Sequence, residues 1–197
     1  MLRLGLTGGI ATGKSTVATM LRDLGFDVLS ADQLAHQLIE PGEPAYDDVI
    51  REFGQSILDR SGKIDRAKLG AIVFAEPAKL ARLNSIIHPR VKVIATQQLD
   101  DWSRSGTRKA AFIEAALLIE AGYEQILDGL VVTWCRPEQQ LERLRARGLS
   151  EAEARQRIAA QLPVGEKVRH ATHRVDCSGL MEETRRQVQE LAAKLRG

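Results

Sequence analysis

Hydrophobic residues recur along this chain at two different spacings, and each spacing predicts one type of element. Leu2, Leu4 and Leu6 occupy every second position, which predicts a short strand. The next apolar residues recur at helical spacing up to a stop at Gly25: Val17, Met20, Leu21 and Leu24. Further strand patterns lie at 26–30, 110–114 and 130–134, with a short one around 174–176. Strands that alternate with helices favour an α/β fold, in which a parallel sheet carries helices on both faces.

The stretch from 45 to 102 has a different pattern, because helical stripes follow one another without a strand. Asp65 is expected to cap one helix, and Pro77 and Pro89 are each expected to start another. The segment 59–62 has turn composition. Because this block is long for a crossover between two strands, we interpret it as an inserted helical subdomain.

The last third of the chain is expected to be mostly helical around the final strand. Between the last two strand patterns lies an arginine-rich pair of helices, and Ser150 and Glu153 have the spacing of a capping box for the second one. The tail, 180–195, reads as an amphipathic helix.

Composition narrows the class of protein. A length of 197 residues suits one domain with a substantial core, or one core with small inserted subdomains. A net charge of +2 implies no strong field for nucleic acid or membrane, so neither partner is expected. The two cysteines, Cys135 and Cys177, have no paired spacing, which favours a reducing compartment. No signal segment or membrane-spanning run is evident, so we expect a cytoplasmic protein.

The segment from Gly8 to Ser15, GGIATGKS, fits the pattern Gly-x4-Gly-Lys-Ser of a phosphate-binding loop. The glycines let the backbone turn tightly, so that its N–H groups form a nest for anions at the start of a helix. Lys14 would reach the β- and γ-phosphates of a nucleotide, and the Ser15 hydroxyl would bind Mg²⁺. The strand before the motif and the helix after it are the context that the motif requires.

Two carboxylates follow predicted strands, where ligands bind in open α/β sheets. Asp32 could accept a proton from an attacking hydroxyl, or it could simply cap the next helix. Glu114 could hold Mg²⁺ through water, or it could be a solvated strand end.

Arginines gather in the predicted helical pair, where one or two could close over phosphates while the others pair with interleaved glutamates. His170 and His173 lack an evident third ligand for a metal. His88 could contact an anionic substrate or cap a helix.

Several blocks, the phosphate-binding loop among them, resemble the dephospho-CoA kinase family, in order and over nearly the whole chain. The blocks are 6–10 with 13–16, Ser30-Ala31-Asp32 with His36, 40–42, His88-Pro89, 117–120, 143–161, Glu166-Lys167 and 175–179. The resemblance implies a P-loop NTPase fold with a five-stranded parallel sheet flanked by helices, a helical substrate-binding insertion at about 33–104 and an arginine-rich lid at about 136–169. The core would then comprise about 1–32, 105–135 and 170–197.

The resemblance also implies a reaction. ATP, with Mg²⁺, would phosphorylate the ribose 3′-hydroxyl of dephospho-CoA, giving CoA and ADP in the last step of CoA biosynthesis. Asp32 would be the base, Lys14 the phosphate clamp and Arg147 the lid arginine. The expected ATP-binding residues are Gly9, Ala11, Thr12, Gly13, Lys14, Ser15 and Thr16. The expected substrate-binding residues are Thr7, Asp32, His88, Glu114 and Leu117. We expect a monomer or a weak homo-oligomer.

The chain departs from the family pattern at five positions without losing Lys14, Ser15 or Asp32. These are Ala11 for a glycine, Ser30 and Thr172 for aspartates, Ala116 for a proline and Cys177 for an asparagine. Alanine at position 11 would be harmless only at a negative φ.

Three other functions remain open at this point. A GTP-dependent switch is disfavoured: Asp59-x-x-Gly62 follows a helix, and the chain's one asparagine, Asn84, lacks the guanine-reading context. A kinase for another nucleoside or nucleotide would fit the loop, Asp32 and the lid equally well. A nucleotide-binding protein without catalysis is opposed by the retained Lys14, Ser15 and Asp32.

Overall fold

The computed structural model describes residues 1–106 and 108–196, which group into two compact units. The sheet unit comprises Met1–Ser30 and Thr96–Gly197, and the helical unit comprises Ala31–Ala95. The predicted insertion, about 33–104, runs further toward the C-terminus, because the last turns of its final helix group with the sheet.

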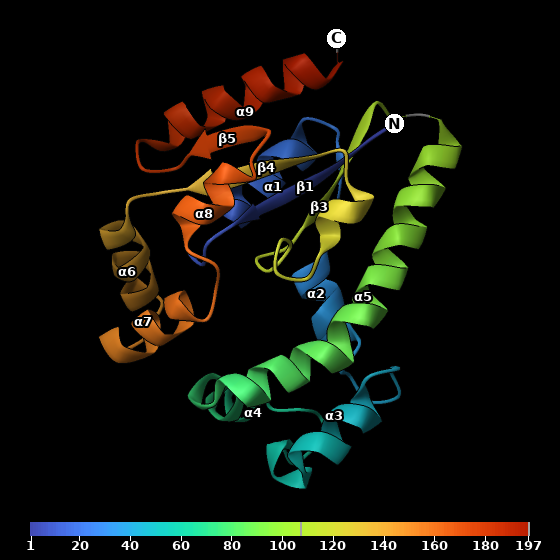
Figure 1. Cartoon of the computed structure of the whole chain (residues 1–197), viewed down its shortest axis with the longest axis vertical. Helices are drawn as coiled ribbons and strands as arrows, with labels where there is room; N and C mark the ends of the chain where they lie inside the picture. The colour runs from blue at the N-terminus through green and yellow to red at the C-terminus, as the bar shows by residue number, and fades with distance from the viewer. Residues whose placement is uncertain (107, 197) are drawn as a thin grey trace. The chain divides into compact units, whose positions relative to one another are not determined.

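All five strands of the sheet unit pair in parallel, in the order β2-β3-β1-β4-β5 (Figure 1). The strands are β1 (Leu2–Gly8), β2 (Asp27–Ser30), β3 (Ala110–Glu114), β4 (Gly129–Trp134) and β5 (His173–Asp176). The helices are α1 (Lys14–Asp23), α6 (Pro137–Ala146), α7 (Glu151–Ala159), α8 (Val164–Arg169), α9 (Met181–Arg196) and the 3₁₀ turn η2 (Tyr123–Ile126). The predicted α/β class and five-stranded parallel sheet are therefore confirmed.

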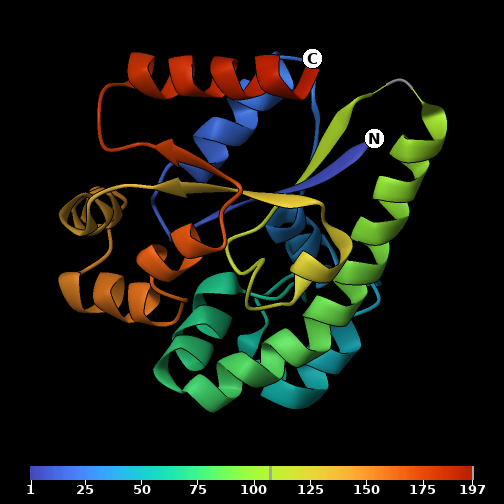
Figure 2. The same cartoon turned by 45° about the horizontal axis from the view of Figure 1, so that its top comes forward.

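Helices α1 and α9 pack together on one face of the sheet, and α8 packs on the other (Figures 1 and 2). Between the sheet and the first pair lies an extended apolar cluster, which we call the sheet core. Its buried members include Leu4, Leu6, Val17, Leu21, Phe112, Val131, Val175, Cys177, Val188 and Leu191. Alternate strand residues supply it, since successive side chains of a strand point to opposite faces.

The helical unit contains α2 (Ala31–Gln37), α3 (Tyr46–Phe53), η1 (Gln55–Ile57), α4 (Arg66–Ala75) and the first part of α5 (Pro77–Ser105). Asp65 caps α4 as predicted, because its carboxylate accepts the N–H groups of Ala67 and Lys68 at 2.9 and 3.2 Å. The predicted turn at 59–62 also forms, since the Asp59 carboxylate accepts N–H groups from Ser61 and Lys63.

One expectation about helices was wrong, and one helix was missed. Pro89 does not start a helix but lies inside α5, which Figure 2 draws as one continuous ribbon. A proline removes one N–H and crowds the preceding turn, so the helix continues only because its apolar face is packed on both sides of the proline, at Ile87 and Val91. Helix α8 was not predicted at all, because its six residues show no apolar period.

No helix in the described ranges is long and apolar enough to cross a membrane.

Candidate active site

The phosphate-binding motif forms the turn between β1 and α1, as its sequence predicted. Gly8 has no room for a side chain, because a Cβ there would lie 2.2 Å from the Thr133 hydroxyl oxygen. Gly13 has a φ of +95°, a conformation that favours glycine, and it directly precedes α1. The loop therefore delivers its backbone to the N-terminus of a helix, where anions are stabilised.

Charged and polar side chains gather around the buried carboxylate of Glu114 beside this loop. The Lys14 ammonium donates to the Glu114 carboxylate at 2.9 Å, and the Ser15 hydroxyl donates to the same oxygen at 3.1 Å. Arg22 approaches the second oxygen at 3.6 Å. The Glu114 side chain is only 5% exposed, so these cations compensate a carboxylate that would be costly to bury alone.

Strand register explains how these groups meet. Glu114 ends β3 and is paired on one side with Leu6 of β1 and on the other with Ser30 of β2. The chain passes directly from Ser30 into α2, whose second residue is Asp32. The predicted carboxylates Glu114 and Asp32 thus follow neighbouring parallel strands, as the sequence suggested.

The other predicted residues of the sheet unit occupy varied environments. Thr7 is buried and donates its hydroxyl to the Ala116 carbonyl at 3.3 Å. Leu117 is half-buried in the segment after β3, and Thr16 is exposed in α1. Arg147 is exposed at the C-terminal end of α6.

Asp32 and His88 belong to the helical unit. Asp32 is half-buried in the first turn of α2, and His88 lies within α5 and so does not cap a helix. Burial lowers the pKa of His36, and Arg66 lowers it further, while Asp32 acts in the opposite direction.

Ala11 is the one non-glycine residue in the described part of the chain with a positive φ, at 62°. The sequence departure at this position is therefore the strained case and not the harmless one. Two of the other departures have local roles. The Thr172 hydroxyl bonds to both backbone groups of Leu130, and Cys177 is buried beside Gly13.

Sequence reasoning missed several side chains that hold the loop. Gln140 and Arg143 of α6, and Gln161 after α7, each bond to the backbone of Ile10 or Ala11. A glutamine at a buried helical position, four residues before Leu144, is the signal that could have indicated Gln140. Arg143 belongs to the arginine-rich pair of helices, but its guanidinium contacts carbonyl groups.

Lys167 is another missed residue, and its side chain is fully buried. Its ammonium donates to the Ala116 carbonyl at 2.5 Å and pairs with Glu120 at 2.7 Å. Glu120 also accepts the N–H of Leu162. This network fastens the segment after β3 to the end of the α6–α7 pair.

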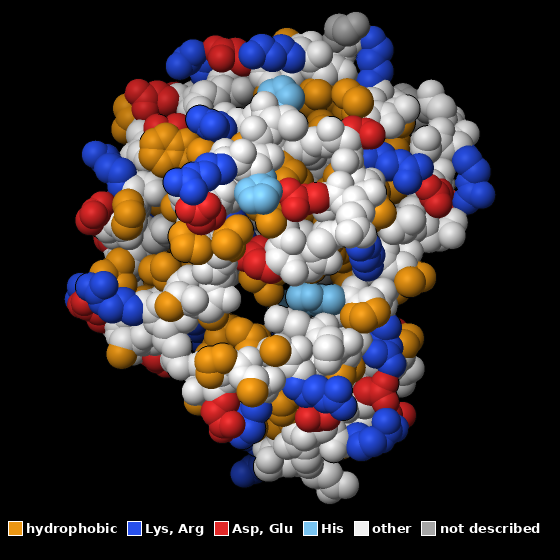
Figure 3. Space-filling model, viewed as in Figure 1, with side chains coloured by type: hydrophobic (Ala, Val, Ile, Leu, Met, Phe, Trp, Pro, Cys, Tyr) orange, Lys and Arg blue, Asp and Glu red, His pale blue; other side chains and the backbone are white. Residues whose placement is uncertain are grey.

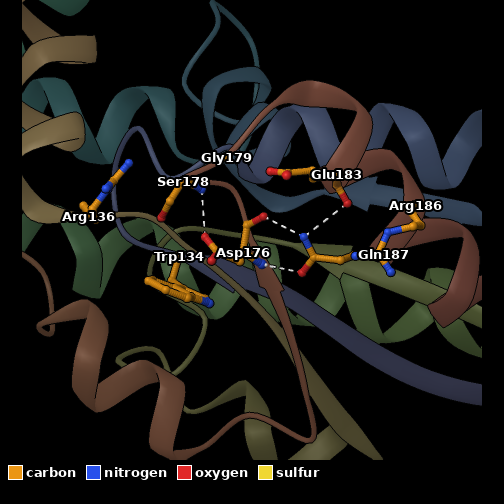
Figure 4. A pocket seen from close by; sticks show the side chains of 8 residues that line it. All are labelled: Trp134, Arg136, Asp176, Ser178, Gly179, Glu183, Arg186 and Gln187. Atoms are coloured by element: carbon orange, nitrogen blue, oxygen red, sulfur yellow. Dashed lines mark hydrogen bonds between the residues drawn. The ribbon is translucent and has the colours of Figure 1, made fainter.

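A polar pocket of about 530 Å³ opens beyond the ends of β4 and β5 (Figure 4). Its lining carries both signs of charge and comprises Trp134, Arg136, Asp176, Ser178, Gly179, Glu183, Arg186 and Gln187. Gln187 fixes one wall, because it bonds to both backbone groups of Asp176 at 2.9 Å.

Figure 3 shows that acidic and basic side chains are interspersed on the face in view, in keeping with the small net charge.

The glycine-rich turn before α1, the Lys14–Glu114 pair and the parallel sheet define a P-loop kinase. Residues 2–183 match the family model described as dephospho-CoA kinase. The chain is 45% identical over 188 residues to the dephospho-CoA kinase of Geobacillus kaustophilus, covering 95% of this chain and 93% of that protein. The chain belongs to the dephospho-CoA kinase family.

Solved structures agree with this assignment. A crystal structure from Thermus thermophilus matches with a TM-score of 0.80 and 33% identity, covering 100% of this chain and 98% of the other. The dephospho-CoA kinase from Campylobacter jejuni matches with a TM-score of 0.71 and 26% identity, covering 98% and 96%.

Proposed function

We propose that the phosphate loop, Asp32 and Arg147 transfer the γ-phosphoryl group of ATP to the ribose 3′-hydroxyl of dephospho-CoA. Membership of the family makes this chain a kinase that phosphorylates dephospho-CoA in CoA biosynthesis. The observation that carries the proposal for the residues is the cluster of Lys14, Ser15 and Glu114 beside a loop that is shaped for phosphates.

Lys14 would bind the β- and γ-phosphates of ATP, and the loop N–H groups from Gly9 to Thr16 would surround them. The 2.9 Å contact with Glu114 keeps the ammonium group at the loop before ATP arrives. Such preorganisation lowers the cost of arranging charge around the transferring group.

The donor set beside the loop fits Mg²⁺. This ion prefers oxygen ligands and is usually held by one or two side chains together with substrate phosphates. The Ser15 hydroxyl and the Glu114 carboxylate lie 3.1 Å apart, and we propose that Ser15 binds the ion directly and Glu114 through water. When bound, Mg²⁺ would neutralise charge on the β- and γ-phosphate oxygens.

Asp32 would accept the proton of the attacking 3′-hydroxyl, and Arg147 would stabilise the charge of the transferring phosphoryl group. Thr7, His88, Glu114 and Leu117 are proposed to contact dephospho-CoA. The helical unit would supply much of this binding surface, with the α6–α7 pair as the lid.

We further propose that the protein works in the cytoplasm as a monomer or weak homo-oligomer. Its two cysteines are free, which suits a reducing compartment.

The first test is ADP release from ATP and Mg²⁺, with and without dephospho-CoA. Release that requires both dephospho-CoA and Lys14, with CoA as product, would support the proposal. We expect Lys14→Ala to lower turnover by at least about a thousandfold, because it removes the clamp of the transferring group. Full activity of this variant would contradict the role of the loop.

Asp32→Asn tests the base. A missing base costs about 10²- to 10⁴-fold in turnover, and we expect the lower part of this range because the transition state is loose. The affinity for ATP should change little. Asp47→Asn is the matched control, since Asp47 is also in the first turn of a helix of the same unit. An equal loss of turnover and ATP affinity in Asp32→Asn would argue against its role as a base.

A further inference from the structure

The phosphate loop is held from two sides. Its second half is fixed to the sheet, because the Thr12 hydroxyl contacts both the Gly9 carbonyl and the Thr133 hydroxyl at 2.8 Å. Thr133 belongs to β4 and also donates to the Thr7 carbonyl. These contacts tie the loop to β1 and β4.

The first half, Ile10 and Ala11, is held instead by the pair of helices α6 and α7, which we call the hairpin. Gln140 donates its Nε2 to the Ile10 carbonyl at 2.8 Å. Gln161, just after α7, accepts the Ile10 N–H at 2.8 Å. Both backbone groups of Ile10 are therefore bonded to side chains of this one supersecondary element.

Arg143 makes the third contact and extends it to a second loop. One terminal nitrogen of its guanidinium donates to the Ala11 carbonyl at 3.1 Å, and the other donates to the Cys177 carbonyl at 2.7 Å. The loop after β1 and the loop after β5 are thus joined by one rigid fork. A lysine, with a single ammonium group on a flexible stem, does not reproduce this geometry.

Ala11 shows that this holding acts against a local preference. A left-handed conformation is unfavourable for alanine and persists only where the surroundings enforce it. Apart from Arg143, Ala11 is packed in a small apolar cluster with Leu144 of α6 and Ala154 of α7. Most of the enforcing groups therefore come from the hairpin, and the Cys135 thiol, just after β4, also donates to the Ala11 carbonyl at 3.9 Å.

We propose that Gln140, Arg143 and Gln161, which we call the hairpin clamp, are positioning residues that hold Ile10 and Ala11 in the shape that binds the phosphates of ATP. ATP affinity then depends on the hairpin being seated on the loop. The inference rests on the proposed binding of ATP by this loop, and it assigns to the hairpin a role separate from that of its arginines as a lid.

The test compares Gln140→Leu, Arg143→Lys, Arg143→Ala and Gln161→Ala with the wild type. The Kd for ATP is measured by titration calorimetry, and KM for dephospho-CoA, kcat and Tm are measured in parallel. We expect Kd for ATP to rise about tenfold in Arg143→Ala, with smaller rises in the two glutamine variants. KM for dephospho-CoA and kcat at saturating ATP should stay within about threefold, because the three side chains of the hairpin clamp bond to backbone groups of the protein.

Gln156→Leu is the matched control, since it makes the same change at an exposed position of α7. Its Kd for ATP should equal that of the wild type. Arg143→Lys should bind ATP nearly as weakly as Arg143→Ala, because one ammonium cannot join both carbonyls.

Rescue separates positioning from general stability. Glycine adopts a positive φ without strain, so a loop with Ala11→Gly needs the clamp less. The double variant Arg143→Ala, Ala11→Gly should recover at least about threefold of the lost ATP affinity. The proposal is overturned if the clamp variants lower Tm but leave Kd for ATP unchanged, or if both substrates weaken equally without rescue. A wild type that binds no ATP would instead refute the proposed function.

Discussion

The sheet core and the apolar cluster of the hairpin differ in size and in the part of the active site that each supports. The sheet core includes fully buried Leu6, Leu21 and Phe112 and draws on two helices and on all five strands, since Val28 of β2 packs against it. The hairpin cluster has three buried members, Ala11, Leu144 and Ala154, with partly buried residues around them. One of its three members is a residue of the phosphate loop.

The sheet core and the hairpin cluster differ in the rigidity that they give to the two halves of the phosphate loop. A region with few buried apolar contacts can open locally without unfolding the whole domain. The charged cluster of Lys14 and Glu114 lies on the sheet side, whereas Ile10 and Ala11 depend on the hairpin. We infer that Lys14, the proposed phosphate clamp, lies on a rigid base and that the hairpin, the proposed lid, can open locally.

The largest effect on stability is expected when a buried leucine is replaced by alanine in each region. Leu21→Ala in the sheet core should lower the free energy of unfolding by about 3–5 kcal/mol, since Leu21 is fully buried. Hairpin opening releases Leu144 but not Leu21, so Leu144→Ala should accelerate exchange of the α6 and α7 amides, whereas Leu21→Ala should leave it nearly unchanged. Native-state hydrogen exchange measures both.

The two regions would form one cooperative core if Leu21→Ala accelerated exchange of the α6 and α7 amides as much as that of the β1 and β4 amides. Leu180→Ala serves as the control for the substitution itself, since Leu180 is 69% exposed and contributes little to either region.

Strand and helix periods made most of the sheet unit predictable. The motif predicted the turn between β1 and α1, and the strand pattern predicted that Glu114 ends β3. The α4 cap at Asp65 and the capping box at Ser150 also followed from local chemistry. Each of these features depends on residues that are close in sequence.

Features that depend on distant residues were missed. The buried charge of Lys167 is compensated by Ala116 and Glu120, about fifty residues earlier, so a short helix without an apolar period gave no sign of it. Gln140 and Gln161 meet Ile10 only in the folded chain. The roles of Asp32, His88 and Arg147 in catalysis or binding stay predictions.

Cys177 provides the next test, since this thiol lies in the sheet core beneath the loop. Burial raises its pKa to about 11. The unfolded chain releases this proton near pH 9 and the folded chain near pH 11, so the contribution to stability is complete below pH 8 and is lost as pH rises through this window. The loss is at most about 1.4 kcal/mol per pH unit.

Urea denaturation at pH 8, 9 and 10 measures this slope. Other groups also titrate in this range, so the informative quantity is the difference between the wild type and Cys177→Ala. We expect the variant to lose less stability as the pH rises. Parallel slopes for the two proteins would mean that Cys177 is more accessible than the packing of the sheet core indicates.

The smallest expected effect is that of Ala11→Gly on stability. Relief of a left-handed alanine yields about 1–2 kcal/mol, and the greater freedom of glycine in the unfolded chain removes about 0.5–1 kcal/mol of this. A net gain of about 0.5–1 kcal/mol should therefore appear, because Ala11 has a φ of 62°. Since Ala11 is part of the hairpin cluster, the gain should slow exchange of the α6 and α7 amides as well as that of strand amides that exchange through global unfolding. A gain confined to the strand amides would show that the strain of the loop persists when the hairpin opens, and a loss would show that the Ala11 methyl packs against Leu144 and Ala154 more favourably than its backbone is strained.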